Sequence, residues 1–275
     1  MRGRDLKEKM QAGGIAYGAM ISIGRSPRWA SAYADFGLDY LIFDTEHAPL
    51  DRGEVGDIMS AMSHTGVVPI VRVVVPWSHY ITQALDAGAQ GVLAPYCETV
   101  EEVVEVVGAT KWRPLKGKVL DEAMATGEFP SEETRRYLEE RNADSVCLVG
   151  IESVPAIENL DAMLEVPGID GIFVGPNDLS ITLGVPDMYD HPKYEEALRT
   201  IISKCRTRNV PVLIHHQTVD LTIKWLREGA RFVLFSTDSR QMHMGMRHEF
   251  GLIKEVGAEL GGEAVEDIGE SREVI

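Results

Sequence analysis

The sequence predicts an α/β fold, a (β/α)₈ TIM barrel with an extended C-terminal helix, from three observations. Eight short apolar runs recur along the 275 residues, helix-length segments separate them, and the apolarity within each run is nearly continuous. Continuous apolarity indicates strands buried on both faces, and helix-length separations indicate parallel crossovers. Eight strands of this kind suggest closure into a barrel.

The expected elements follow in chain order. The strands are AYGAMIS, YLIFD, VVPIVRVV, GVLAPY, SVCLVGI, GIFVG, VPVLIHH and FVLFS. Pro27 opens a helix that Gly37 follows, and later helices are expected to end at Gly66 and Gly108, because proline suits a first helical turn and glycine suits the position after the last. Residues 110–142 exceed a simple connection and combine a basic loop with a second helix. Long connections of this kind often cover active sites.

A long helix is expected over residues 239–260. We therefore predict one barrel domain, residues 1–260, and a polar C-terminal tail, residues 261–275, that is frayed or contacts another copy.

Composition narrows the possible partners. A net charge of -16 disfavours nucleic acid. Membrane association is not expected either, because no apolar run approaches the roughly 18 residues that span a bilayer, and the N-terminus is charged. Cys97, Cys147 and Cys205 lack the spacing of a zinc site or a disulfide framework, so we expect reduced thiols and a cytoplasmic protein.

Polar side chains just after the strands are the candidates for chemistry, because barrel active sites lie at the C-terminal strand ends. They are Asp44, Glu46, His47, Arg72, Glu152 and Asp178. Glu152 and Asp178 follow consecutive strands, and two carboxylates with open positions for water and substrate suit Mg²⁺ or Mn²⁺, with Co²⁺ as a further candidate. Such a metal could bind a 2-oxo acid and stabilise its enolate. The alternative is that each acid caps a helix.

His47 is a candidate general base that Asp44 could orient. Arg72 ends an apolar strand and could meet a substrate anion, or could form a structural ion pair with an acid of a neighbouring strand. In GPNDLS, Gly175 and Asn177 begin a helix whose free amides could hold a substrate carboxylate.

Other patterns favour structural roles. Adjacent His215 and His216 point to opposite faces of one strand, so at most one faces the barrel interior. The MHMGMRH run suits a packing surface of the last helix. No lysine stands at a strand end, which disfavours a Schiff base, and no P-loop, GxGxxG, HExxH or GxSxG motif is present.

The segments FDTEHAP, LDAGAQGVLAPYCETVEE and GIESVPAIENLDAMLEVPGIDGIFVGPNDLS resemble the HpcH/HpaI family of metal-dependent pyruvate aldolases. The resemblance covers most of the chain. It implies that Glu152 and Asp178 bind the metal, that His47 and Asp44 form the base dyad, and that Arg72 steadies the pyruvate oxygen. It also implies a hexamer of dimers that exchange the last helix, with Asp86 reaching a neighbour's active site; Asp86 could instead be an ordinary helix-surface residue.

This sequence departs from the family pattern at two places, which limits how far the family's residue roles apply to it. The family commonly has Gln two residues before the metal-binding Glu, where this chain has Gly150, and its Gly-Arg-Gly-type loop is replaced by RPLKGKVLDEAM.

The expected activity is cleavage of a 4-hydroxy-2-oxo acid to pyruvate and an aldehyde. The alternatives are an oxaloacetate or acyl-CoA carbon–carbon lyase or synthase, which a CoA requirement would distinguish, and a non-enzymatic binding or assembly protein.

Overall fold

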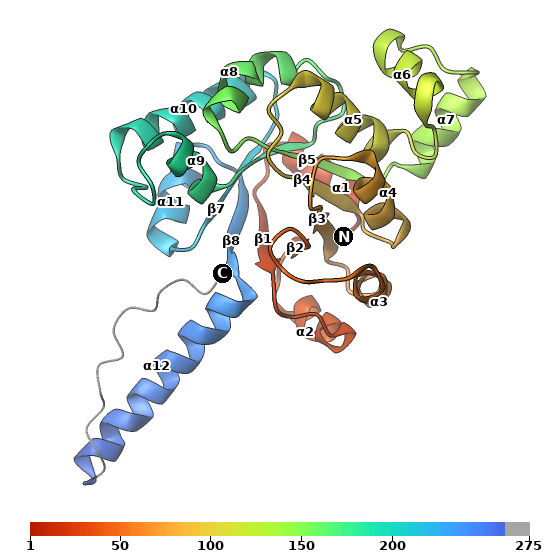
Figure 1. Cartoon of the computed structure of the whole chain (residues 1–275). Coiled ribbons are helices and arrows are strands. Elements are labelled where there is room, and N and C mark those ends of the chain that lie inside the picture. Colours follow the sequence, from red (N-terminus) through yellow and green to blue (C-terminus); the bar gives the residue numbers. More distant parts are fainter. Residues whose placement is uncertain (262–275) are drawn as a thin grey trace.

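The computed structural model describes residues 1–261 and contains a closed barrel of eight parallel strands, as predicted (Figure 1). Each strand pairs with the next in the chain, and β8 pairs with β1. The strands are β1 (Ala16–Ile21), β2 (Tyr40–Asp44), β3 (Val68–Arg72), β4 (Gly91–Ala94), β5 (Val146–Gly150), β6 (Gly171–Val174), β7 (Val212–His216) and β8 (Phe232–Thr237).

Helices surround the barrel, and α1 precedes the first strand. They are α1 (Gly3–Gln11), the 3₁₀ helix η1 (Pro27–Trp29), α2 (Ala30–Asp35), α3 (Arg52–Met62), α4 (Ser78–Asp86), α5 (Val100–Lys111), α6 (Gly117–Thr126), α7 (Glu132–Arg141), α8 (Val154–Met163), α9 (Pro176–Thr182), α10 (Pro192–Thr207), α11 (Val219–Glu228) and α12 (Asp238–Glu259). Side-chain caps begin several of them: Thr99 accepts from the Glu102 amide at the start of α5, and Ser153 from the Ala156 amide at the start of α8.

The apolar core has two parts. One lies inside the barrel and includes Tyr40, Ile42 and Ile70, while the other lies between the barrel and the helices and includes Leu41, Phe43 and Val71. Alternate residues of each strand therefore point inward and outward. This alternation directs the inward side chains at the C-terminal strand ends into the barrel mouth.

Two local predictions were wrong. Helix α5 does not end at Gly108 but continues to Lys111, and Gly108 is buried against Leu120 of α6. Residues 110–142 hold two helices, α6 and α7, where a loop and one helix were expected. Gly108 is therefore a close-packing position, which its sequence context does not distinguish from a helix end.

The last described helix, α12, extends away from the barrel (Figure 1). None of its residues is buried, so it does not cover the outer face of β8 in the way the other helices cover their strands. The tail predicted for residues 261–275 lies outside the described residues, apart from Gly261. The three cysteines are buried and free, as expected. No helix within residues 1–261 has the length and apolarity to cross a membrane.

Candidate active site at the barrel mouth

Asp44 and Arg72 form a buried ion pair at the mouth. They are register partners on the adjacent strands β2 and β3. Arg72 donates from Nε to Asp44 Oδ1 at 2.8 Å and from Nη2 to Oδ2 at 2.5 Å, while Nη1 lies 3.1 Å from Glu46 Oε2. Burial alone would raise the pKa of Asp44, but the hydrogen bonds and charge of Arg72 hold it below its usual value. The alternative expected for Arg72, an ion pair with a neighbouring-strand acid, is therefore present.

The turn after β2 carries His47 at the surface of the mouth. Asp44 Oδ1 accepts from the amides of Glu46 at 2.9 Å and His47 at 3.4 Å. Asp44 thus stabilises the turn by accepting from the backbone amides of the turn. The predicted contact between Asp44 and the His47 ring is not found within residues 1–261. The ring, whose side chain is 53% exposed, instead has Nε2 3.7 Å from Glu46 Oε2. Sequence reasoning assigned Glu46 no role, although it stands between the two predicted residues.

Glu152 follows β5 and is 3% exposed. Its Oε1 accepts from the Tyr96 amide at 3.0 Å, in the turn after β4. Burial raises the pKa of Glu152 to about 8; the Tyr96 hydrogen bond and Arg72 oppose this increase, whereas the charges of Glu46 and Asp178 add to it. Glu152 is therefore a buried carboxyl group held close to two other carboxylates.

Asp178 lies in the first turn of α9, after β6, and is partly exposed. Burial is the main cause of the raised pKa of Glu152 and of Glu46, and the charge of Asp178 adds to both increases. The three carboxylates are therefore near enough to interact at the mouth. Gly175 is buried beside Glu152. Asn177 is exposed, and its Nδ2 donates to Asp187 Oδ1 at 2.9 Å, so its side chain secures the loop after α9.

The donor set at the mouth fits a hard divalent cation. Glu152 and Asp178 supply carboxylate oxygens, and a cation would offset the mutual repulsion of the three acids. Within residues 1–261 no three His, Cys, Asp or Glu side chains form a ready-made metal site.

His215 and His216 point to opposite sides of β7, as expected. Leu213 belongs to the core inside the barrel and Ile214 to the outer core, so the alternation places His215 inside and His216 outside. The His215 ring nitrogen Nε2 lies 3.1 Å from the Ser236 carbonyl oxygen, and burial lowers the pKa of His215 to about 4. His216 packs against the rings of Tyr189 and Tyr194.

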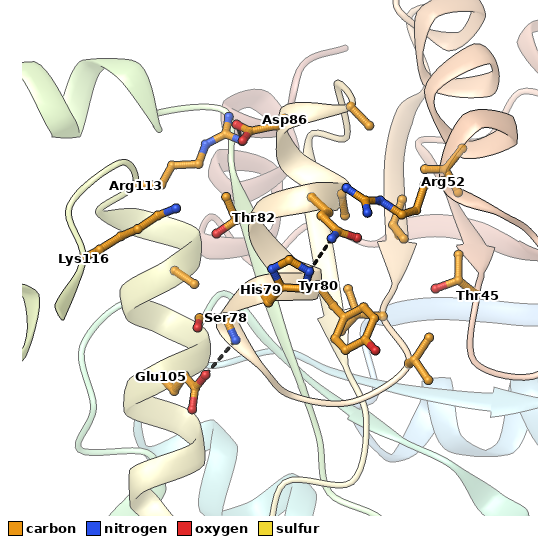
Figure 2. A pocket seen from close by; sticks show the side chains of 18 of the residues that line it. Thr45, Arg52, Ser78, His79, Tyr80, Thr82, Asp86, Glu105, Arg113 and Lys116 are labelled. Carbon is orange, nitrogen blue, oxygen red and sulfur yellow. Dashed lines mark hydrogen bonds and ion pairs between the residues drawn. The ribbon is translucent and has the colours of Figure 1, made fainter.

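Asp86 lies at the end of α4, and Arg113 Nη1 donates to its Oδ1 at 3.0 Å. Both line a cavity of about 1510 Å³ whose lining residues come mainly from α3, α4, α5 and α6 (Figure 2). In this cavity His79 contacts Gln83, and the Ser78 amide donates to Glu105. The Asp86 side chain is 61% exposed. The cavity that it lines includes none of the proposed metal and base residues.

The raised pKa of Glu152 predicts how stability depends on pH in protein stripped of metal. The folded pKa of about 8 exceeds the ordinary 4.5, so the folded state retains a proton that the unfolded chain loses. The free energy of unfolding should therefore fall as pH rises from about 4.5 to 8, by at most ~1.4 kcal/mol per pH unit from this group. Urea unfolding of the native chain and of Glu152→Gln across this range measures the difference; identical pH slopes would contradict the prediction.

Comparisons with known proteins identify the family of the chain. The family model described as HpcH/HpaI aldolase/citrate lyase matches residues 19–243. The chain is 32% identical over 254 residues to a 2-keto-3-deoxy-L-rhamnonate aldolase of Salmonella gallinarum, covering 91% of this chain and 93% of the relative. An Escherichia coli protein of the same name is 33% identical over 234 residues, covering 85% and 86%.

Solved structures show the same similarity. An HpcH/HpaI aldolase/citrate lyase family protein from Burkholderia cenocepacia has a TM-score of 0.78 and 28% identity, covering 91% of this chain and 99% of that chain. The match of the family model extends from β1 into α12 and includes every residue of the mouth described above. The chain therefore belongs to the HpcH/HpaI aldolase/citrate lyase family.

Proposed function

We propose that this protein is a divalent-metal-dependent aldolase that cleaves a 4-hydroxy-2-oxo acid into pyruvate and an aldehyde. The observation that carries the proposal is the gathering of Glu152, Asp178 and Glu46 beside the buried cation Arg72 at the barrel mouth. Three acids and one arginine at a single site suit a cation and an anionic substrate together. The curated relatives named above, called 2-keto-3-deoxy-L-rhamnonate aldolases, support a 2-oxo sugar acid as the substrate class.

Glu152 and Asp178 would hold the metal, with Mg²⁺ or Mn²⁺ as the first candidates and Co²⁺ as a further one. When bound, the cation supplies Lewis-acid polarisation of the 2-oxo group. Backbone amides near Gly175 and Asn177 would receive the substrate carboxylate. Arg72 would stabilise negative charge on the 2-oxo oxygen, and Asp44 keeps its guanidinium in place.

Cleavage breaks the C3–C4 bond of the substrate. We assign the proton of the C4 hydroxyl to the His47 ring, which stands exposed at the mouth, and Glu46 Oε2 at 3.7 Å stabilises the imidazolium that results. The bonding electrons pass to the 2-oxo group as an enolate, which regains a proton at C3 to give pyruvate. C4, whose hydroxyl has lost its proton, becomes the carbonyl carbon of the departing aldehyde. None of the eight strands contains a lysine that could form a Schiff base with the 2-oxo group.

A substrate panel tests the proposal. Pyruvate release would be measured from a series of 4-hydroxy-2-oxo acids, from oxaloacetate, and from acyl-CoA substrates. Turnover confined to the hydroxy-oxo acids, without any CoA requirement, is the expected result. The family description also names citrate lyase, which keeps carbon–carbon chemistry on oxaloacetate or acyl-CoA as the second candidate. A strict CoA requirement would favour that candidate.

We further propose a homo-oligomer, a hexamer built from dimers that exchange α12, in the cytoplasm. Helix α12 carries exposed apolar residues at three- and four-residue spacing, which form one stripe: Met242, Met246, Phe250 and Ile253. On the barrel side, Tyr17 of β1 and Val219 of α11 are exposed, where a TIM barrel would carry its last helix. The apolar stripe of a second copy's α12 would cover these exposed apolar side chains. Asp86, on the outside of the barrel, is placed by this proposal next to a neighbour's site.

Charges on the stripe should break the oligomer. The double substitution Phe250→Asp and Ile253→Asp places two carboxylates where α12 would be buried, so we expect smaller species, ending at a monomer. Light scattering coupled to gel filtration measures the mass. Glu255→Lys, an exposed position on the opposite side of α12, is the control and should leave the mass unchanged. A native chain that is itself monomeric would contradict the assembly proposal but not the aldolase proposal.

A further inference from the structure

The Glu152 carboxylate occupies space that two glycines leave empty. A Cβ placed on Gly150 would lie 2.4 Å from Glu152 Oε1, 2.9 Å from the Tyr96 amide nitrogen and 3.0 Å from Pro95 Cα. One placed on Gly175 would lie 2.1 Å from Glu152 Oε2. Contacts this short are repulsive, because carbon and oxygen normally stay more than about 3 Å apart. The carboxylate therefore lies in a slot between the backbones of Gly150 and Gly175. Any side chain at position 150 would exclude the carboxylate from its present place.

The slot has a hydrogen-bond donor at one end. The Tyr96 amide donates to Glu152 Oε1 at 3.0 Å, and the next amide, of Cys97, donates to the Gly150 carbonyl oxygen at 3.0 Å. Tyr96 has φ of 51°, in the left-handed region that a side chain disfavours. The turn after β4 thus adopts a costly conformation in which successive amides meet β5. The Cys97 amide binds the end of β5, and the Tyr96 amide binds the Glu152 carboxylate.

We propose that Gly150 is a positioning residue that lets the Glu152 carboxylate withdraw into this slot, where the Tyr96 amide competes with the cation for it. The inference rests on the proposed metal-dependent function. Oε1 accepts from the Tyr96 amide in a slot where Glu152 is 3% exposed, and in this proposal the carboxylate leaves that amide when it meets a hydrated cation. Coupling between two binding events is reciprocal. The hydrogen bond from the Tyr96 amide therefore weakens cation binding, and cation binding weakens that hydrogen bond.

Gly150→Ala closes the slot and is the first test. Free Mn²⁺ would be measured by electron paramagnetic resonance during titration of the oligomeric protein, at a pH where the native chain binds. Loss of one charge-assisted hydrogen bond to Glu152 predicts about tenfold tighter Mn²⁺ binding in Gly150→Ala. Gly18→Ala is the matched control, because its Cβ would lie 2.3 Å from the Tyr40 ring inside the barrel and away from Glu152. It should lose stability and keep native Mn²⁺ affinity.

A second measurement uses the native chain and does not depend on the variant folding. Crystal structures with and without Mg²⁺ should differ at one contact: the Tyr96 amide to Glu152 Oε1 distance, 3.0 Å here, should exceed hydrogen-bond range with Mg²⁺ bound. An intact contact with Mg²⁺, or unchanged or weaker Mn²⁺ binding in Gly150→Ala, would overturn the inference alone. Absence of any Mn²⁺ binding to the native chain would overturn the proposed function together with it.

Discussion

Glu152→Gln is expected to weaken cation binding strongly and to reduce turnover. The amide side chain keeps the size of Glu152 and an acceptor for the Tyr96 amide, so the packing of this 3% exposed residue is preserved while its negative charge is lost. Loss of one of two protein carboxylates should reduce kcat/KM by about 1,000-fold, because Lewis-acid stabilisation contributes several kcal/mol. Mn²⁺ titration and pyruvate release with 4-hydroxy-2-oxo acids measure the two effects on the same preparation.

Glu158→Gln is the matched control. Glu158 lies on α8, six residues along the chain, and is exposed, so its neutralisation should change neither quantity. Native Mn²⁺ affinity in the Glu152→Gln protein would contradict the assignment of Glu152 as a metal ligand.

Arg72→Met is expected to cost stability and activity together. The substitution preserves much of the side-chain volume but leaves Asp44, 3% exposed, without the guanidinium that lowers its pKa. Breaking a buried pair from one side typically costs ~3–5 kcal/mol, and we expect a loss in that range from urea unfolding. Turnover should fall by more than about 100-fold, since a donor to the developing enolate is also lost.

The double variant Arg72→Met with Asp44→Asn separates the two effects. Removal of the unpaired charge should recover part of the stability without restoring turnover. A single Arg72→Met protein with native stability would contradict the buried pair, and native turnover would contradict the role of Arg72 at the substrate.

The sequence was sufficient for the strands because each is a short, nearly continuous apolar run separated from the next by a helix-length segment. The Asp44–Arg72 pair shows the same reasoning at residue level. Asp44 and Arg72 each lie two residues after an inward-facing residue, Ile42 and Ile70, so the alternation along the strands directs both into the mouth. Glu152 and Asp178 follow consecutive strands and were predicted to be neighbours on the same ground. Burial is the main cause of the raised pKa of Glu152, and the charge of Asp178 adds to it. Their role as metal ligands stays a prediction.

Other features depend on backbone contacts that no residue pattern records. The donor to Glu152 is a main-chain amide of Tyr96, made available by a left-handed turn at a tyrosine. Gly150 was recognised only as a missing side chain, whereas the structure shows that the carboxylate of Glu152 fills its place. Likewise, Asp44 was expected to orient the His47 ring but contacts the His47 amide, because its oxygens are already committed to Arg72.

The most direct test of the metal-dependent aldolase is the activity of the native oligomer after treatment with a chelator. Pyruvate release from the best 4-hydroxy-2-oxo acid would be followed in stripped protein and again after Mg²⁺, Mn²⁺ or Co²⁺ is restored, with Glu152→Gln beside it. Activity of the native chain is expected to disappear on stripping and to return with at least one of these cations, whereas Glu152→Gln should not recover it. Full turnover in the stripped protein would contradict it.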